Sequence, residues 1–259
     1  MIRSLYTATS GMRVQQYKMD TLGNNIANVS TFGYKRSRPD FKEALYDVME
    51  LRPAEAEPSP LVGNGVRVGS IQRDFRQGGL QQTNNSLDLA LEGSGFFTIA
   101  TEDGEELYTR DGTFKLSYLP NGQTRLDNRE GYPLLDQYGQ PFVFNGHIQE
   151  EDLLINQDGS IYLNQDGNNL YQGTLGIYRF ADPGSLQSLR ASYFIATEDS
   201  GQPIQALDTR VIQGYLEHSN VDLSQEMTDL IMAQRAYQIN SRVVHTADEM
   251  EKQANNLRG

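Results

Sequence analysis

Residues 5–29 read LYTATSGMRVQQYKMDTLGNNIANV, a stretch without proline in which apolar side chains recur at alternating intervals of three and four residues. The positions with this spacing are Leu5, Ala8, Met12, Gln15, Met19, Leu22, Ile26 and Val29. A seven-residue repeat sustained over this length is typical of a helix that packs along one narrow face. We therefore predict a helical arm here, ended by Gly33 in the left-handed conformation. Packing of this helix on its own domain would explain the repeat equally well.

The end of the chain carries a matching pattern. Its members are Leu223, Met227, Leu230, Ala233, Ala236, Asn240, Val243, Ala247, Met250, Ala254 and Leu257, with a change of phase near residue 230. Many of these side chains are small, so two such helices can approach closely but bury little apolar area. A helix pair of this kind is marginally stable in water. We predict that the two terminal arms pair and gain stability by packing against other copies of the chain.

Between the arms the hydrophobic pattern changes to a period of two. The runs that read as short strands are 87–91, 96–99, 107–110, 113–116, 153–155, 161–163, 175–178 and 193–195. Asn-Gly or Asp-Gly pairs at 103–104, 111–112, 121–122, 145–146, 158–159 and 166–167 favour turns with positive φ between such runs. These signals predict an α+β fold, with two coiled-coil-like terminal helices flanking a mainly antiparallel β domain.

Composition divides the chain at the same places. Of the 24 glycines, 20 lie between residues 36 and 222, together with all nine prolines. We predict a helical arm over 1–35, a linker over 36–66 with a Pro-rich stretch at 52–60, a β-rich domain over 67–216 and a helical arm over 217–259 that pairs with the first.

The 259 residues include 22 Lys+Arg and 34 Asp+Glu, a net charge of −12. Such a chain repels phosphate backbones and anionic lipids, which disfavours nucleic acid and membrane surfaces as partners. The charge is uneven, because residues 1–35 carry +3, residues 223–259 carry −1 and the region between them carries −14. We therefore expect the acidic middle region to face solvent. No apolar run is long enough for a signal peptide or a membrane span, so export would need a route without a cleaved signal.

The sequence offers no clear catalytic, cofactor-binding or metal-binding residues. There is no cysteine, and His147, His218 and His245 are each isolated from other ligand-type residues. The glycines near residue 65 lack the spacing of a phosphate loop, and the Asp-Gly turn at 166–167 lacks the distal Glu of a calcium loop. An enzyme is therefore disfavoured, although a glycoside hydrolase needs only two carboxylates positioned by the fold.

Three stretches resemble the bacterial flagellar rod and hook proteins. Residues 24–35, NNIANVSTFGYK, are similar to the N-terminal signature of that family, residues 78–114 to its middle block, and residues 213–241 to its C-terminal block. The positions that carry the resemblance are Asn24, Asn25, Asn28, Thr31, Gly33, Tyr34, Lys35, Gly93, Gly95, Phe96, Phe97, Thr109, Arg110, Gly112, Gly214, Glu217, Ser219, Asn220, Gln234, Arg235, Tyr237 and Asn240. Within the family, the chain looks most similar to the distal-rod members.

The resemblance implies a structural subunit of the flagellar basal body. It implies terminal helices that are partly disordered in the free monomer and a homopolymer that forms a hollow, torque-transmitting shaft. Its partners would be other rod and hook subunits, the flagellar type III export apparatus and ring proteins around the rod. The alternatives are a proximal-rod or hook-type paralogue, an exported module that binds peptidoglycan or ring proteins, and a cell-wall hydrolase.

Overall fold

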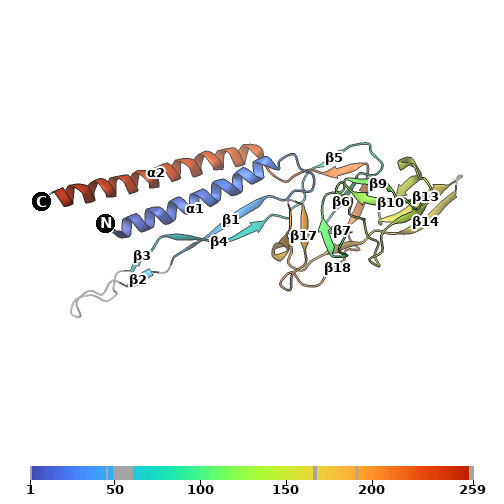
Figure 1. Cartoon of the computed structure of the whole chain (residues 1–259), viewed down its shortest axis with the longest axis horizontal. Coiled ribbons are helices and arrows are strands. Elements are labelled where there is room, and N and C mark those ends of the chain that lie inside the picture. Colours follow the sequence, from blue (N-terminus) through green and yellow to red (C-terminus); the bar gives the residue numbers. More distant parts are fainter. Residues whose placement is uncertain (1, 45, 49–60, 166–167, 191, 257–259) are drawn as a thin grey trace. The chain divides into compact units, whose positions relative to one another are not determined.

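The computed structural model describes residues 2–44, 46–48, 61–165, 168–190 and 192–256. Two helices, α1 (Ile2–Ala27) and α2 (Leu223–Asn256), flank the strands in the sequence, and the strand pairs are antiparallel (Figure 1). The predicted α+β class is therefore confirmed. The Pro-rich stretch 52–60, the turn at 166–167 and Leu257 lie outside the described residues.

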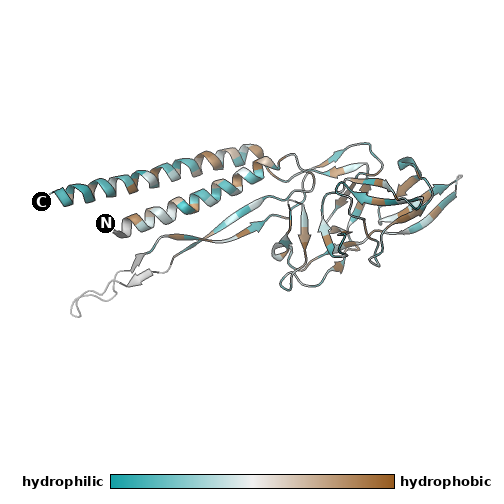
Figure 2. Ribbon diagram, viewed as in Figure 1, coloured by the Kyte–Doolittle hydropathy of each residue, from teal (hydrophilic) through white to brown (hydrophobic). Residues whose placement is uncertain are grey.

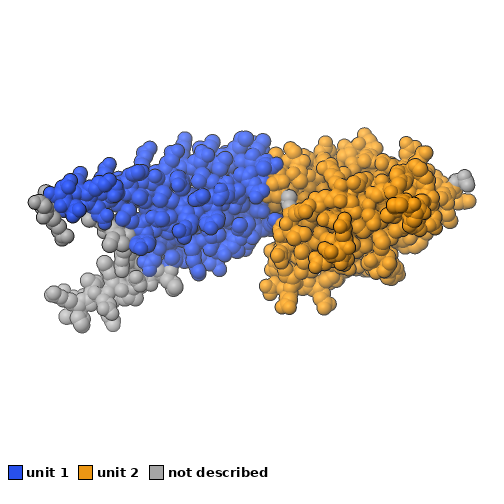
Figure 3. Space-filling model, in the orientation of Figure 1, with its two compact units in different colours: residues 1–27, 37–73, 222–259 blue, residues 28–36, 74–221 orange. Residues whose placement is uncertain are grey.

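The chain forms two compact units, coloured separately in Figure 3. The first, here called the helical unit, comprises residues 1–27, 37–73 and 222–259. The second, here called the sheet unit, comprises residues 28–36 and 74–221. Figure 2 shows that hydrophilic residues predominate along both helices, whereas hydrophobic residues are frequent on the strands of the sheet unit.

In the helical unit, α1 packs against α2 and against a long hairpin. The hairpin consists of β1 (Ser37–Glu43) paired with β4 (Val66–Arg73), and β2 (Tyr46–Val48) pairs with β3 (Leu61–Gly63) beyond it. The Val66 backbone N–H donates to Ser10 Oγ on α1 at 3.4 Å. The structure thus differs from the predicted linker over 36–66, because part of that segment forms strands that pack on α1. These strands contain many polar residues, so their sequences lack the clear apolar alternation that predicts a strand.

The sheet unit contains several small antiparallel sheets among its described residues. One has the order β16 (Gln187–Ser188), β17 (Tyr193–Ile195), β8 (Glu106–Thr109), β7 (Phe96–Ala100), β15 (Ile177–Arg179) and β18 (Ile204–Gln205). Two others have the orders β11 (Val143–Asn145), β10 (Gln123–Asn128), β9 (Phe114–Tyr118) and β12 (Leu153–Ile155), β13 (Ser160–Gln165), β14 (Asn168–Thr174). Two further two-stranded sheets are formed by β19 (Arg210–Gln213) with β6 (Leu89–Glu92), and by β20 (Tyr215–Glu217) with β5 (Leu80–Gln82).

Each of the eight predicted strands overlaps an observed strand. Their alternating apolar side chains form the main core, in which Leu89, Phe97, Leu107 and Leu126 are fully buried. A second, aromatic cluster is built around Phe96 and includes Tyr108, Phe180, Leu186 and Phe194. The sheet unit therefore has an apolar interior of its own, made of two clusters.

The turn glycines largely follow the sequence. Gly104, Gly122, Gly146 and Gly159 all have positive φ, as Asn-Gly and Asp-Gly turns require. Gly112 is different, because its role is close approach: a Cβ there would lie 1.6 Å from the Leu89 carbonyl oxygen.

Gly33 has the predicted left-handed φ, at +68°. It does not cap α1, however, since the helix ends at Ala27 and Gly33 lies in a later turn. A Cβ on Gly33 would lie 2.5 Å from the Asp111 backbone nitrogen, so the turn packs directly on another backbone segment of the sheet unit.

Candidate assembly site

Part of each predicted helix seam is enclosed within the helical unit. The buried or half-buried members are Leu5, Ala8, Met12, Gln15, Met19, Leu22 and Ile26 on α1, and Leu230, Ala233, Ala236, Asn240 and Ala247 on α2. The helices approach closely at Gly11, where an added Cβ would lie 2.9 Å from Asn240 Nδ2. Ala233, Ala236 and Ala247 of α2 thus lie on its enclosed face.

The other predicted seam residues on α2 face solvent. Leu223, Met227, Val243, Met250 and Ala254 are exposed, whereas Val29 is half-buried in the sheet unit. The enclosed face of α2 is centred on a single row of residues at intervals of seven, namely Glu226, Ala233, Asn240 and Ala247, here called the enclosed row. Positions three or four residues from this row lie at its edge or outside it.

A buried polar contact ties the two helices to the hairpin. The Asn25 side-chain amide donates to Glu226 Oε2 at 2.9 Å and to the Ser37 carbonyl at 2.8 Å. The Ser37 backbone N–H donates back to Asn25 Oδ1 at 2.9 Å. Both Asn25 and Glu226 are fully buried. Glu226 was not predicted as a site residue, because an acidic residue in a first helical turn is ordinary.

In the sheet unit, three motif residues from distant parts of the sequence form a buried ion cluster, Lys35–Glu217–Arg110. Lys35 Nζ donates to Glu217 Oε1 at 2.6 Å, and Arg110 Nη1 donates to Glu217 Oε2 at 3.2 Å. Their side chains are 1–3% exposed. The three residues lie in the stretches that resemble the flagellar family, but their spacing in the sequence gives no indication that they meet.

Backbone groups complete this cluster. Lys35 Nζ also donates to the Arg76 carbonyl, Arg110 Nη2 donates to the Gly93 carbonyl, and the Gly78 N–H donates to Glu217 Oε1. Burial lowers the pKa of Lys35, a shift that the Glu217 carboxylate opposes. Burial also lowers the pKa of Arg110, but a guanidinium remains protonated because its ordinary pKa is so high. One carboxylate therefore neutralises one of two buried cations.

Asn220 ties together three backbone segments of the sheet unit. Its Oδ1 accepts from the Arg36 N–H at 2.8 Å. Its Nδ2 donates to the Asp74 and Arg76 carbonyls at 2.8 and 3.0 Å. The chain passes between the two units four times: after Ala27, after Arg36, before Asp74 and after Val221. Asn220 thus fixes the backbone beside the last three of these crossings.

The remaining motif positions have structural roles or are exposed. Thr31 donates to Asn28 Oδ1, Thr109 Oγ1 accepts from the Asp111 N–H, Ser219 Oγ accepts from the Val221 N–H, and the Gly214 carbonyl accepts from the Thr83 N–H. The buried positions are Gly33, Tyr34, Gly95, Phe96, Phe97 and Gly112, and the half-buried ones are Gly214, Tyr237 and Asn240. Asn24, Gly93, Gln234 and Arg235 are exposed.

These arrangements hold backbone segments of the chain together. Among the described residues, no group of three His, Asp or Glu side chains could hold a metal ion. The His147 ring lies against Tyr118, and the His218 ring lies against Phe32. Neither described helix has an apolar stretch that could cross a membrane. The described residues thus form a sheet unit in which sequence-distant side chains meet in buried contacts, and a helical unit whose helices present exposed apolar residues.

Models of three protein families match this chain. "Flagella basal body rod protein" matches residues 5–35, "Flagellar hook protein FlgE/F/G D1 domain" matches 90–168, and "Flagellar basal body rod FlgEFG protein C-terminal" matches 212–257. The first and third cover the arms, and the second covers β7 to β13 of the sheet unit, a segment that includes Phe97 and Arg110.

Full-length relatives agree. The chain is 36% identical to the flagellar basal-body rod protein FlgG of Borreliella burgdorferi, over 100% of this chain and 99% of the relative. It is 35% identical to FlgG of Buchnera aphidicola subsp. Schizaphis graminum, over 99% and 100% of the two chains. It is 30% identical to the flagellar hook-basal body complex protein FlhP of Bacillus subtilis, over 100% of both. This chain therefore belongs to the family of flagellar basal-body rod proteins.

Proposed function

We propose that this chain, a structural rod subunit of the flagellar basal body, polymerises with its own copies and with other rod and hook subunits. The product is a hollow helical shaft that transmits torque and conducts exported subunits. The two helices of each copy form the inner layer, and the acidic sheet unit faces outward. The subunit is structural and carries out no catalysis.

The observation that carries this proposal is an exposed apolar row on α2. Met232, Ile239, Val243 and Met250 follow one another at intervals of seven, four and seven residues, and each is between 43% and 60% exposed. This spacing keeps them on one side of the helix. Full burial of each side chain would stabilise the associated state by about 1–2 kcal/mol, so the row favours association with further helices.

Export and order of assembly follow from the same proposal. The subunit leaves the cytoplasm through the flagellar type III apparatus without a cleaved signal peptide, and ring proteins surround the finished rod. Its arms are partly disordered in the free monomer and become ordered when neighbouring helices cover the apolar row. The mostly polar helices of the helical unit support this view, since they bury few large apolar side chains.

The test replaces the exposed row with charge. In a strain whose own copy is replaced, the double variant Ile239→Asp with Val243→Asp is expected to give truncated rods and no motility. The matched control, Gln238→Asp with His245→Asp, changes two exposed polar residues of the same helix and is expected to assemble. Electron microscopy of isolated basal bodies measures both. Normal rods from the first variant would contradict the proposal.

The point of truncation addresses the paralogue alternative. If rod assembly stops after the proximal rod in a strain that lacks this chain, the subunit belongs to the distal rod. An earlier stop indicates a proximal subunit, and a complete rod without a hook indicates a hook-type paralogue.

A further inference from the structure

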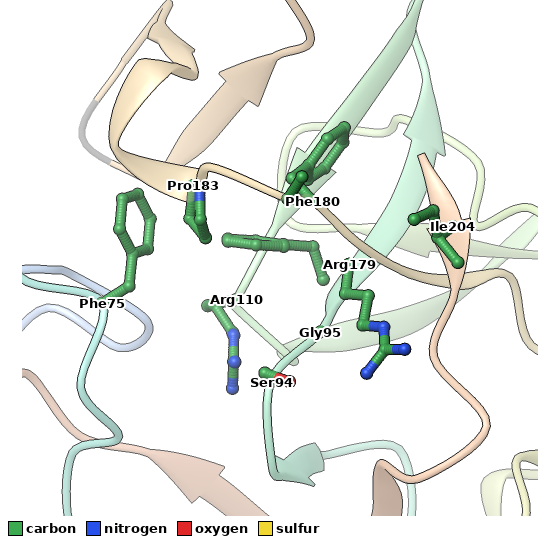
Figure 4. A pocket seen from close by; sticks show the side chains of 10 residues that line it. Phe75, Ser94, Gly95, Arg110, Arg179, Phe180, Pro183 and Ile204 are labelled. Atoms are coloured by element: carbon green, nitrogen blue, oxygen red, sulfur yellow. The ribbon is translucent and has the colours of Figure 1, made fainter. Parts of the chain in front are cut away.

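A pocket in the sheet unit is not used by the helix contacts. It has a volume of about 360 Å³ and is lined by Phe75, Ser94, Gly95, Phe96, Arg110, Arg179, Phe180, Ala181, Pro183 and Ile204. Figure 4 shows Phe75, Pro183 and Phe180 along one side of this view, and Arg110, Ser94 and Arg179 along the other. The pocket therefore combines aromatic walls with two cations.

One nitrogen of the Arg110 guanidinium has no hydrogen-bond partner among the described residues. Its two terminal nitrogens bond to Glu217 and Gly93, and its guanidinium lies 5.3 Å from the centre of the Phe96 ring. Its Nε is buried and has no hydrogen-bond partner among the described residues. Buried donors are nearly always paired. Arg110 lines the pocket, so its guanidinium places a buried positive charge beside it.

Arg179 adds positive charge at the same place. Its side chain is 47% exposed and lies 3.8 Å from the exposed carboxylate of Asp208, which is a loose surface pair. Ile204, another lining residue, is also exposed. A fitting occupant therefore carries a carboxylate next to an apolar group that packs against the phenyl rings in the lining of the pocket.

The protein itself supplies such groups in excess. The region between the arms carries a net charge of −14. Exposed carboxylates with apolar neighbours occur in the sheet unit, for example Asp208 beside the exposed Leu207. In a polymer, the sheet units of other copies are present at high effective concentration.

We propose that this pocket receives an exposed carboxylate and its apolar neighbour from the sheet unit of a second copy of this chain. The contact links sheet units outside the helical layer. The inference rests on the proposed polymer, because that polymer brings the second copy to the pocket.

The test places a photo-crosslinking benzoyl-phenylalanine at Ala181, an exposed residue of the pocket, in full-length protein expressed in motile cells. The same group at Ile239 reports helix contacts. The expected result is a crosslinked dimer of this chain from both positions, with the Ala181 adduct mapping to an acidic segment of the second copy. A crosslink from Ala181 to a different protein, or none, would overturn the inference.

The two positions separate the two ideas. A dimer from Ile239 without one from Ala181 removes the pocket contact but leaves the polymer. No dimer from either position removes both.

A charge reversal sharpens the result. Arg179→Glu is expected to lower the Ala181 dimer yield about fivefold, since like charges then meet at the pocket. The matched variant Arg190→Glu reverses another exposed arginine of the sheet unit, which pairs with Glu130 and does not line the pocket. It is expected to leave the yield unchanged. Equal yields from the two variants would contradict the proposed contact.

Discussion

The two units of this chain bury different kinds of residue. The sheet unit encloses large apolar side chains such as Leu89, Phe97 and Leu126 and seals them with strands. On α2, the buried residues are Glu226, Ala233 and Ala247, while methionine and isoleucine side chains face solvent. The sheet unit has the interior of a self-sufficient fold. On the helices of the helical unit few large apolar side chains are buried, and we propose that other copies complete its interior.

The largest expected difference comes from truncating the apolar core. Phe97→Ala is expected to lower the free energy of unfolding by about 3–5 kcal/mol, because Phe97 is fully buried and its loss leaves a cavity. Ile239→Ala on α2 removes an exposed side chain and is expected to change it by less than about 0.5 kcal/mol. Urea titrations of the full chain measure both. Similar losses would show that the two units do not differ as described.

The ion cluster is expected to have the next largest effect. Glu217→Gln leaves Lys35 and Arg110 buried without their carboxylate, which is expected to cost about 3 kcal/mol. Glu130→Gln removes the partner of Arg190 in an exposed pair and is expected to cost less than about 1 kcal/mol. Thermal unfolding of the two variants provides the comparison. A stable Glu217→Gln protein would mean that the cluster does not lock the sheet unit.

The helical unit has a polar lock of its own, expected to be weaker. Asn25→Ala removes the bonds to Glu226 and to both backbone groups of Ser37, and is expected to cost about 1–3 kcal/mol. Far-UV circular dichroism during unfolding follows the helices. Gln16→Ala changes an exposed residue of the same helix and serves as the control. The idea fails if both variants melt alike.

The smallest effect is a pH dependence. Burial lowers the pKa of Lys35 in the folded chain, so between that pKa and 10.5 the unfolded chain binds more protons. The free energy of unfolding contributed by Lys35 therefore rises with pH in this window. Lys35→Met is expected to flatten the rise, as measured by unfolding at several pH values above neutrality. A steeper rise in the variant would contradict the assignment.

Much of the sheet unit can be predicted from the sequence because its strands alternate. The runs at 96–99 and 161–163 have apolar residues that enter one core, and Asx-Gly turns separate them. The hairpin of β1 and β4 escapes prediction because its strands lie against α1 and remain mostly exposed.

Sites made by distant residues are harder to predict. Nothing in the spacing of Lys35, Arg110 and Glu217 indicates that they meet, because tertiary packing brings together segments about 75 to 182 residues apart. The change of phase in α2 has a related cause. The acidic Glu226 lies in the enclosed row because it pairs with Asn25. The apolar pattern instead places Leu223 and Met227 in the seam, and both are exposed.

Hydrogen exchange of the free monomer and of assembled rods tests the difference between the two units most directly. The amides of Phe97, Leu107 and Leu126 are expected to be protected in both states, because their core is complete within one chain. The amides of α1 and α2 are expected to exchange rapidly in the monomer and slowly in the rod. Helices that are as protected in the monomer as in the rod would contradict the proposal that other copies complete the helical unit.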